Sequence, residues 1–179
     1  VHTIPLDHRV YTNGFLFQEK PKPRKLHIEN IQQYDEIETC DFHNIKAGKD
    51  FVLSTGEVVP NEELTIDPPK PKSYAFCSDT AYKPSIVPII KDVDLLYHEA
   101  TFLKDREDLC DKTKHATAEQ AASIAKQANA NKLIIGHYSS RYSNLQDFKK
   151  EAQTVFENVE LAEAGKLYST NSFPIEVLN

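Results

Sequence analysis

The sequence predicts a layered α/β fold that carries a hydrolytic metal site along one edge of its sheet. Three short apolar runs are each followed by residues that can bind a metal or move a proton: Asp79 after the first, His98 and Glu99 after the second, and His137 after the third. A helix start signal lies between the second and third runs, so strand, helix and strand follow one another. Presenting such side chains from successive strand ends is how hydrolytic metal sites are built on this scaffold.

The first element is predicted to be a hairpin. Residues 1–19 hold two short extended segments around Asn13 and Gly14, a residue pair typical of tight turns. Phe15 and Phe17 fall on one face of the second segment, because side chains alternate along a strand. We therefore expect two adjacent strands joined near Gly14.

The next segment departs from the core. From Glu19 to about Asp50 the apolar residues show no clean helix or strand periodicity. Residues 20–25 are Lys-Pro-Lys-Pro-Arg-Lys, a stiff basic run. A second proline cluster at 67–72 leads back to an apolar strand. We interpret the intervening chain as an excursion from the core.

The helix before the third apolar run has the clearest boundaries. Thr117 and Gln120 have the spacing of a capping box, and small or apolar residues recur on one helical face until Asn129. The other elements follow from the two periodicities of helix and strand. They are strands at 74–77, 93–97 and 133–135, a helix at about 145–156 and further extended chain at 159–168.

Composition narrows the class of protein. The 179 residues suffice for one domain with a core, and 40% hydrophobic and 27% charged residues are typical of globular chains. No apolar run approaches the roughly 18 residues of a membrane helix. The net charge of -6 argues against uniform attraction to nucleic acid but leaves room for a local basic patch. An odd number of cysteines (Cys40, Cys77, Cys110) without Cys-x-x-Cys spacing favours a reducing compartment.

Each candidate site residue also has an ordinary structural interpretation. Asp79 is equally consistent with a turn or helix-cap aspartate. A lone histidine such as His137 at the end of an apolar run is more often a satisfied core residue than a ligand. His8 has the weakest isolated signal, and His98 with Glu99 fits a salt-bridged strand edge.

The joint pattern favours chemistry over these separate interpretations. Two histidines and an aspartate suit zinc, and a carboxylate shared between two ions suits the two-metal arrangement of phosphodiester hydrolysis. His115 lies two residues before the capped helix, where it can face Glu99. A carboxylate partner raises the pKa of a histidine and keeps it protonated, as a general acid requires. Arg141 offers a planar donor pair for phosphate. The pattern describes a metal-dependent phosphodiesterase that lacks part of its ligand set.

The order of the motifs resembles the later part of ribonuclease Z, the tRNA 3′-processing endonuclease family of the metallo-β-lactamase superfamily. The Ser-Asp-Thr element is common across the superfamily, whereas the later motifs in series are specific, and the resemblance covers nearly the whole chain. The motifs are Pro-Leu-Asp-His at 5–8, Gly-Phe-Leu-Phe-Gln-Glu at 14–19, Phe-Cys-Ser-Asp-Thr at 76–80, His-Glu-Ala-Thr-Phe at 98–102, His-Ala-Thr-Ala-Glu-Gln-Ala-Ala at 115–122 and His-Tyr-Ser-Ser-Arg-Tyr at 137–142.

The resemblance implies a role for each site residue. His8 would bind the first metal, Asp79 would bridge the two metals, and His137 would bind the second. Glu99 and His115 would form the pair that protonates the leaving 3′ oxygen or stabilises its charge. The remaining implied contacts are with substrate: Arg141 would hold phosphate, and a tRNA-binding arm inserted at about 20–49 would use Lys20, Lys22, Arg24 and Lys25.

The resemblance also implies what the complete enzyme would be. It would be an αββα sandwich with two Zn²⁺ ions per active site, a cytoplasmic homodimer that cuts the 3′ trailer from precursor tRNA and has no membrane segment. The family's His-x-His-x-Asp-His motif occurs nowhere in these 179 residues, and the sequence contains no methionine. We therefore expect residues 1–179 to form the C-terminal part of one metallo-β-lactamase-like domain, inactive when isolated.

Two alternatives stay open at this point. Another hydrolase of the superfamily, acting on a small ester or sulfate, would lack the basic arm and the Arg-Tyr loop. A non-catalytic RNA-binding or assembly module would keep the fold without the site. The upstream sequence separates these alternatives, because an intact His-x-His-x-Asp-His motif supports catalysis.

Overall fold

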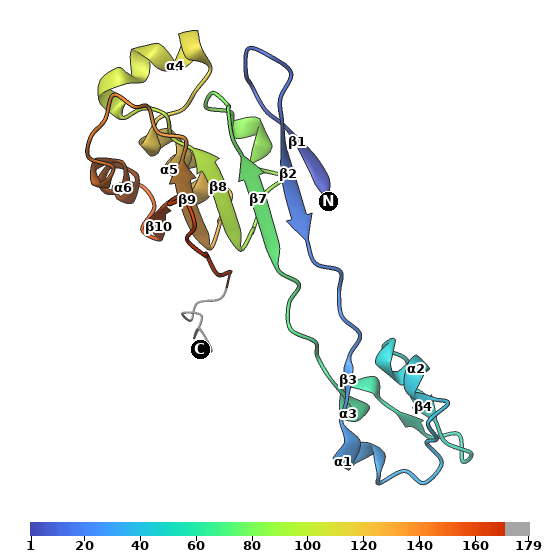
Figure 1. Ribbon diagram of the computed structural model, residues 1–179. Coiled ribbons are helices and arrows are strands. Elements are labelled where there is room, and N and C mark those ends of the chain that lie inside the picture. Colours follow the sequence, from blue (N-terminus) through green and yellow to red (C-terminus); the bar gives the residue numbers. More distant parts are fainter. Residues whose placement is uncertain (171–179) are drawn as a thin grey trace. The chain divides into compact units, whose positions relative to one another are not determined.

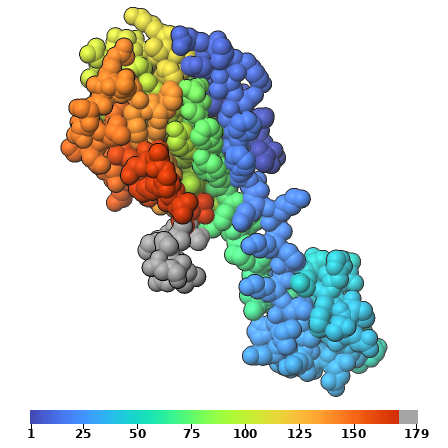
Figure 2. All heavy atoms as spheres, viewed as in Figure 1, coloured from blue at the N-terminus to red at the C-terminus, as the bar shows by residue number. Residues whose placement is uncertain are grey.

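The structure is a computed structural model that describes residues 1–170. The chain divides into two compact units, one formed by Val1–Gln18 with the chain from Lys72 onward and one formed by Glu19–Pro71. We call them the sheet unit and the inserted unit (Figures 1 and 2). Each is described by itself.

A six-stranded mixed sheet forms the centre of the sheet unit, and it confirms the predicted α/β class. The strand order is β1-β2-β7-β8-β9-β10 (Figure 1). The first three strands pair antiparallel, and the last four pair parallel. Their bounds are β1 His2–Pro5, β2 Asn13–Gln18, β7 Ser73–Cys77, β8 Leu95–Glu99, β9 Lys132–Gly136 and β10 Val159–Leu161.

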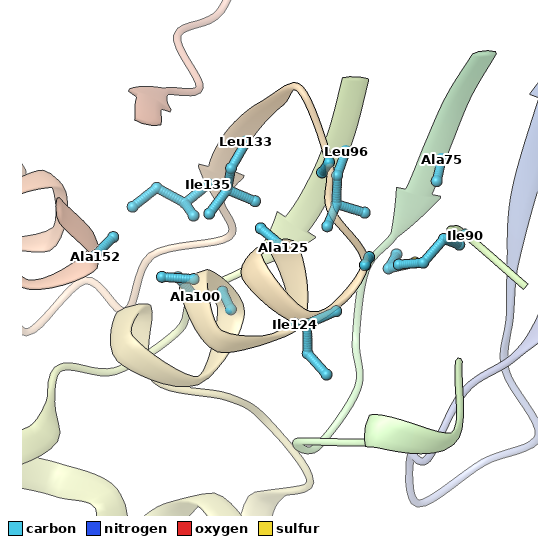
Figure 3. Packing of buried hydrophobic residues seen from close by; sticks show 14 of the residues in the cluster. Ala75, Ile90, Leu96, Ala100, Ile124, Ala125, Leu133, Ile135 and Ala152 are labelled. Atoms are coloured by element: carbon cyan, nitrogen blue, oxygen red, sulfur yellow. The ribbon is translucent and has the colours of Figure 1, made fainter. Parts of the chain in front are cut away.

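The core of this unit lies where helix α5 (Ala118–Gln127) packs on the sheet. Figure 3 shows Ala125 of this helix on the side of Leu96 and Leu133 of the neighbouring strands, and Ile124 belongs to the same buried cluster. Small alanines on the buried face let the helix approach the sheet closely. The predicted capping box is confirmed, since Thr117 Oγ1 accepts from Gln120 N and Thr117 N donates to Gln120 Oε1, both at 3.1 Å.

The predicted hairpin is present, but its turn was placed wrongly. Gly14 lies inside β2 opposite Ile4, so residues 6–12 form the connection instead of Asn13 and Gly14. A Cβ on Gly14 would collide with the carbonyl oxygen of Phe76 on the adjacent strand. The glycine therefore permits a close approach of two strands, and the longer loop carries His8.

Other boundaries also differ from the prediction. β8 continues through His98 to Glu99, so both residues belong to the strand. Helix α6 (Gln146–Gln153) ends before residue 156. Helix α4 (Glu107–Thr113) and the short 3₁₀ turns η1 (Pro84–Ile86) and η2 (Lys104–Arg106) had no periodicity that identified them.

The inserted unit has a small core of its own. Ile31, Ile45, Val59 and Leu64 are buried together. Ile45 packs against Val59 and Leu64, which lie later in the chain than the predicted arm at about 20–49. The unit continues to Pro71. Its elements are β3 Lys25–Leu26, α1 Ile28–Ile31, α2 Phe42–Lys46, β4 Phe51–Val52, β5 Val58–Val59, α3 Asn61–Leu64 and β6 Thr65–Ile66.

The helices are all short. Within residues 1–170, no helix has the length and apolar character needed to cross a membrane.

Candidate metal centre

Three parallel strands bring the polar side chains to one edge of the sheet. Cys77, His98 and Ile135 are paired neighbours near the ends of β7, β8 and β9. Asp79 and His137 follow the first and third of these strands within two residues. The carboxyl ends of parallel strands lie at the same edge, so residues far apart in sequence meet there.

The backbone at this edge is strained where it carries candidate ligands. Asp79 has φ 55° and His137 has φ 63°, the left-handed conformation that costs non-glycine residues about 1–2 kcal/mol each. Such strain persists where the surrounding contacts over-determine the conformation, as at binding and active sites. Here it directs both side chains toward the same point.

Asp79 and His137 face each other across a short gap. His137 Nε2 lies 3.1 Å from Asp79 Oδ1. On its other side, His137 Nδ1 lies 2.9 Å from Thr101 Oγ1, and that hydroxyl donates its single proton to Glu99 Oε2 at 2.7 Å. The hydroxyl therefore accepts from His137 Nδ1, and Nε2 is the ring nitrogen that faces Asp79.

A histidine nitrogen and a carboxylate oxygen this close have either a proton or a metal cation between them. Two atoms bound to one zinc ion at about 2.0–2.1 Å and at the tetrahedral angle lie about 3.3 Å apart. The observed separation of 3.1 Å between His137 Nε2 and Asp79 Oδ1 is close to that value. The imidazole and carboxylate donors also match the preferences of zinc.

Glu99 is fully buried and surrounded by donors. Its Oε1 accepts from His115 Nδ1 at 2.7 Å and Thr80 N at 2.8 Å. Its Oε2 accepts from Thr101 Oγ1 at 2.7 Å, Thr101 N at 3.2 Å and Ala116 N at 3.1 Å. Burial alone would raise the pKa of Glu99, but the hydrogen bonds from His115 and Thr101 and the charge of His115 lower it overall. Glu99 is therefore a fixed, buried carboxylate.

The properties of His115 are set by its hydrogen bond to that carboxylate. Its hydrogen bond to Glu99 raises the pKa of His115 in spite of the opposing effect of burial. Because Nδ1 is engaged by Glu99, Nε2 is the atom left for other partners. The ring centroid lies 5.2 Å from that of His8 and 5.1 Å from that of His137. His115 thus lies next to both of the other histidines.

His8 reaches the centre from the loop between β1 and β2. Its Nδ1 lies 3.1 Å from the carbonyl oxygen of Lys114, so Nδ1 carries a proton and Nε2 is the nitrogen left for other partners. The loop is held by Asp7, whose N–H donates to Thr80 Oγ1 at 3.1 Å and whose carbonyl accepts from Ala81 N at 2.8 Å. His8 is therefore placed by contacts more than 70 residues away in sequence.

Two groups of three residues in the described chain have ligand atoms within 4.8 Å of one another. One group is His8, Asp79 and His115, and the other is Glu99, His115 and His137. Both groups use His115, so they share a ligand. The three ligands predicted from the sequence thus lie in one cluster, and the predicted proton-transfer pair lies within it.

The predicted phosphate ligand, Arg141, is exposed in the loop that follows β9. Its backbone N–H donates to Ser139 Oγ at 3.5 Å. The loop is anchored next to it by Tyr142, whose hydroxyl accepts from Leu103 N at 3.1 Å. The phosphate role of the guanidinium stays a prediction.

The predicted arm residues lie in the inserted unit, at Lys20, Lys22, Arg24 and Lys25. The three lysines are exposed. Arg24 differs, because its Nε donates to Thr65 Oγ1 at 2.6 Å and its guanidinium pairs with Asp67. Arg24 therefore joins the two ends of the inserted unit.

Sequence reasoning missed the residues that orient the ligands. Thr101 connects Glu99 with His137, Thr80 connects Glu99 with the hairpin loop, and Lys114 holds His8. Thr80 and Thr101 adjoin predicted site residues in their motifs, and that adjacency was the available signal. Nothing in the sequence around Lys114 indicated its contact.

Comparison with known proteins identifies the family. No family model matches the chain. A Ribonuclease Z of Parabacteroides distasonis is 47% identical over 165 residues, which cover 92% of this chain and 54% of that protein. A Ribonuclease Z of Porphyromonas gingivalis is 46% identical over 156 residues, which cover 87% and 51%. The chain belongs to the ribonuclease Z family. It spans about half the length of these curated relatives.

Solved structures agree with the fold of the ribonuclease Z family. Human tRNase Z, short form, matches with a TM-score of 0.52 and 20% identity. The match covers 94% of this chain and 42% of the human chain. The metallo-β-lactamase fold protein YhfI of Bacillus subtilis has a TM-score of 0.51 and 28% identity, with coverages of 55% and 40%. The predicted metallo-β-lactamase-like fold is confirmed.

The bridge formed by Thr101 leads to a prediction for the complete ribonuclease Z. Thr101→Val keeps the shape of the side chain but removes the hydroxyl that binds both Glu99 and His137. We expect metal affinity to fall about 10- to 100-fold, because removing a partner of a ligating histidine has that effect. Zinc titration monitored by a competing chelator measures it. Thr113→Val is the matched control, since its hydroxyl donates only to Leu109 O within α4.

Unchanged zinc affinity in Thr101→Val would show that the hydroxyl does not orient His137. A loss of equal size in Thr113→Val would point to a general loss of stability.

Proposed function

We propose that this chain works as part of a zinc-dependent endoribonuclease that removes the 3′ trailer from precursor tRNA. The observation that carries the proposal is the cluster of Asp79, His137, His115 and Glu99 at one sheet edge in a chain of the ribonuclease Z family. The human structural neighbour is a tRNase Z, which agrees with tRNA as the class of substrate.

The proposed ligands are His8 for one zinc ion, Asp79 between the two ions and His137 for the other. Bound zinc would supply a water whose pKa is lowered to about 7, and hence a hydroxide near neutral pH. His8 and His137 each have Nδ1 engaged by an acceptor, so both present Nε2. Orienting imidazoles through their second nitrogen in this way is usual for metal ligands.

His115 is proposed as the general acid. Its pKa is raised by the hydrogen bond to Glu99, which favours the protonated ring. A metal ligand must be deprotonated, so this shift favours proton transfer over ligation. Glu99 holds Nδ1 and thereby directs the Nε2 proton toward the leaving 3′ oxygen. Arg141 would hold a phosphate of the substrate with its planar donors.

The test is cleavage of precursor tRNA by the complete enzyme. We expect a product that ends in a 3′ hydroxyl at the acceptor stem, loss of cleavage on chelation and recovery with added zinc. Cleavage that persists after zinc is removed would contradict the metal mechanism. An enzyme that hydrolyses small esters or sulfates but not precursor tRNA would support the alternative hydrolase.

The inserted unit is proposed to bind the tRNA. The unit contains the exposed Lys20, Lys22 and Lys25, and Lys46 adjoins them because Arg24 N donates to Lys46 O at 3.1 Å. Clustered cations of this kind attract phosphates even when the chain as a whole is acidic.

Neutralising these lysines has a specific expected signature. In the complete enzyme, the triple variant Lys20→Gln, Lys22→Gln and Lys25→Gln is expected to bind precursor tRNA more weakly and with less salt dependence. Each lost phosphate contact lowers the slope of log K against log salt by about 0.9 on a duplex. Binding is measured across a salt series. Arg24 is left intact, because its pairing with Asp67 would confound the result.

The control replaces three exposed lysines of the sheet unit, Lys91, Lys126 and Lys150, by glutamine. It changes the net charge equally and should leave the salt slope nearly unchanged. Cleavage of a small phosphodiester should be unaffected in both triple variants. Equal loss on tRNA and on the small substrate would contradict a role for the lysines in tRNA binding.

The remaining parts of the proposal concern assembly and location. We propose a homodimer for the complete enzyme, as the family resemblance implies. We place it in the cytoplasm, and this rests on Cys40, Cys77 and Cys110, which are free thiols in the described chain.

A further inference from the structure

Lys114 has an unusual place between two parts of the metal centre. It is the C-cap of α4, and it directly precedes His115. Its φ is 61°, the left-handed conformation that ends many helices and that glycine or asparagine normally adopts. A lysine at such a position therefore calls for a specific reason.

Its contacts supply that reason. The N–H of Lys114 donates to Cys110 O at 2.7 Å, which closes α4. Its carbonyl oxygen lies 3.1 Å from His8 Nδ1, and its ammonium lies 3.2 Å from Asp7 Oδ2. One residue thus holds two successive residues of the hairpin loop, more than 100 positions away in sequence.

The two contacts differ in weight. The ion pair joins side chains that are 38% and 44% exposed, and pairs in such surroundings contribute little. The hydrogen bond to His8 decides which ring nitrogen carries the proton, and hence which one offers a lone pair. Its direction depends on the left-handed backbone of Lys114, because that conformation turns the carbonyl toward the loop.

We propose that Lys114 is a positioning residue for His8, acting through its left-handed backbone. The carbonyl holds the proton on His8 Nδ1 and so presents Nε2 toward Asp79 and His115. That this orientation favours zinc binding rests on the proposed function. The tautomer of His8 can be tested whether or not the proposed function is correct.

The test measures the protonated nitrogen of His8 by ¹⁵N NMR of the metal-free protein, at about pH 8 where ordinary imidazoles are neutral. Lys114→Gly keeps the left-handed conformation accessible, and Lys114→Val disfavours it strongly because valine is β-branched. We expect His8 to stay protonated on Nδ1 in wild type and in Lys114→Gly. In Lys114→Val the Nδ1-protonated fraction should fall to that of a free imidazole.

Two further variants separate the backbone effect from other causes. Asp7→Asn removes the ion pair alone and should leave the tautomer of His8 unchanged. Asn129→Val places the same residue type at another left-handed position, φ 51°, just past the C-terminal end of α5, and should also leave it unchanged.

Three results would overturn the proposal. The first is an unchanged tautomer of His8 in Lys114→Val. The second is a fall of the Nδ1-protonated fraction of His8 in Lys114→Gly that is as large as the fall in Lys114→Val. The third is an equal fall of that fraction in Asn129→Val. The proposed function fails separately. If His8 stays protonated on Nδ1 but the complete enzyme needs no zinc, Lys114 is still a positioning residue and the proposed metal mechanism is contradicted.

Discussion

In the complete enzyme, His115→Ala is expected to slow cleavage of precursor tRNA about 10²- to 10⁴-fold while the affinity for tRNA changes little. The reason is that an acid acting on the leaving oxygen interacts mainly with the transition state. His115 is suited to this role because its Nδ1 is fixed 2.7 Å from a buried carboxylate and its pKa is raised by that contact. Single-turnover kinetics and a separate binding assay distinguish the two effects.

The control for this substitution is His43→Ala, which removes an exposed histidine of the inserted unit and should leave the cleavage rate unchanged. A normal single-turnover rate in His115→Ala, with weaker tRNA binding, would mean that His115 only holds substrate.

Glu99→Gln should share much of the catalytic defect, since the amide cannot hold the charged His115. The double variant should add little to either single variant, because the two residues act as a unit. The structure adds a cost in folding. Glu99 accepts five hydrogen bonds, and an amide NH₂ would face backbone N–H groups that need an acceptor. Thermal unfolding of Glu99→Gln therefore separates lost stability from lost chemistry.

The second large effect is expected for the 179-residue chain itself, which should not cleave precursor tRNA even with added zinc. Its two candidate ligand groups share His115, and the proposed acid is that same residue. A catalytic zinc site normally has three protein ligands and an open position. With His115 and its partner Glu99 reserved for proton transfer, the proposed ligands are His8 and Asp79 for one ion and Asp79 and His137 for the other, which is fewer than three for each.

Adding the N-terminal half of a close relative, such as the Parabacteroides distasonis Ribonuclease Z, tests this expectation. That half is expected to bring the family's His-x-His-x-Asp-His motif, so zinc uptake and cleavage should appear together. The same half with the histidines of that motif replaced by alanine is the control. Robust zinc-dependent processing by the purified 179-residue chain would contradict the view that its ligand set is incomplete.

Local sequence determined the elements whose signals lie within a few residues of one another. The capping box between Thr117 and Gln120 and the strand before His137 belong to this class, because hydrogen bonding along one turn and side-chain alternation are local properties. Asp79, Glu99 and His137 were identified for the same reason. Each closely follows or ends an apolar strand, and parallel strands present their ends at one edge.

The tertiary structure decided what depends on distant partners. The turn predicted at Gly14 moved to residues 6–12 because Gly14 fits against the carbonyl of Phe76, on a strand about 60 residues later. Arg24 pairs with Asp67, 43 positions later in the chain, and its predicted contact with tRNA stays a prediction. No local pattern encodes either contact, since each one forms only after the chain has folded back on itself.

The orientation of the ligands belongs to this second class. His8 takes its tautomer from Lys114 across 106 positions, and His137 takes its tautomer from Thr101 across 36. The amino-acid types indicated which residues can bind a metal, because that property belongs to the side chain alone. Which nitrogen each histidine presents depends on a hydrogen bond to its other nitrogen, and only packing of the hairpin loop, the strand ends and the end of α4 supplies that partner.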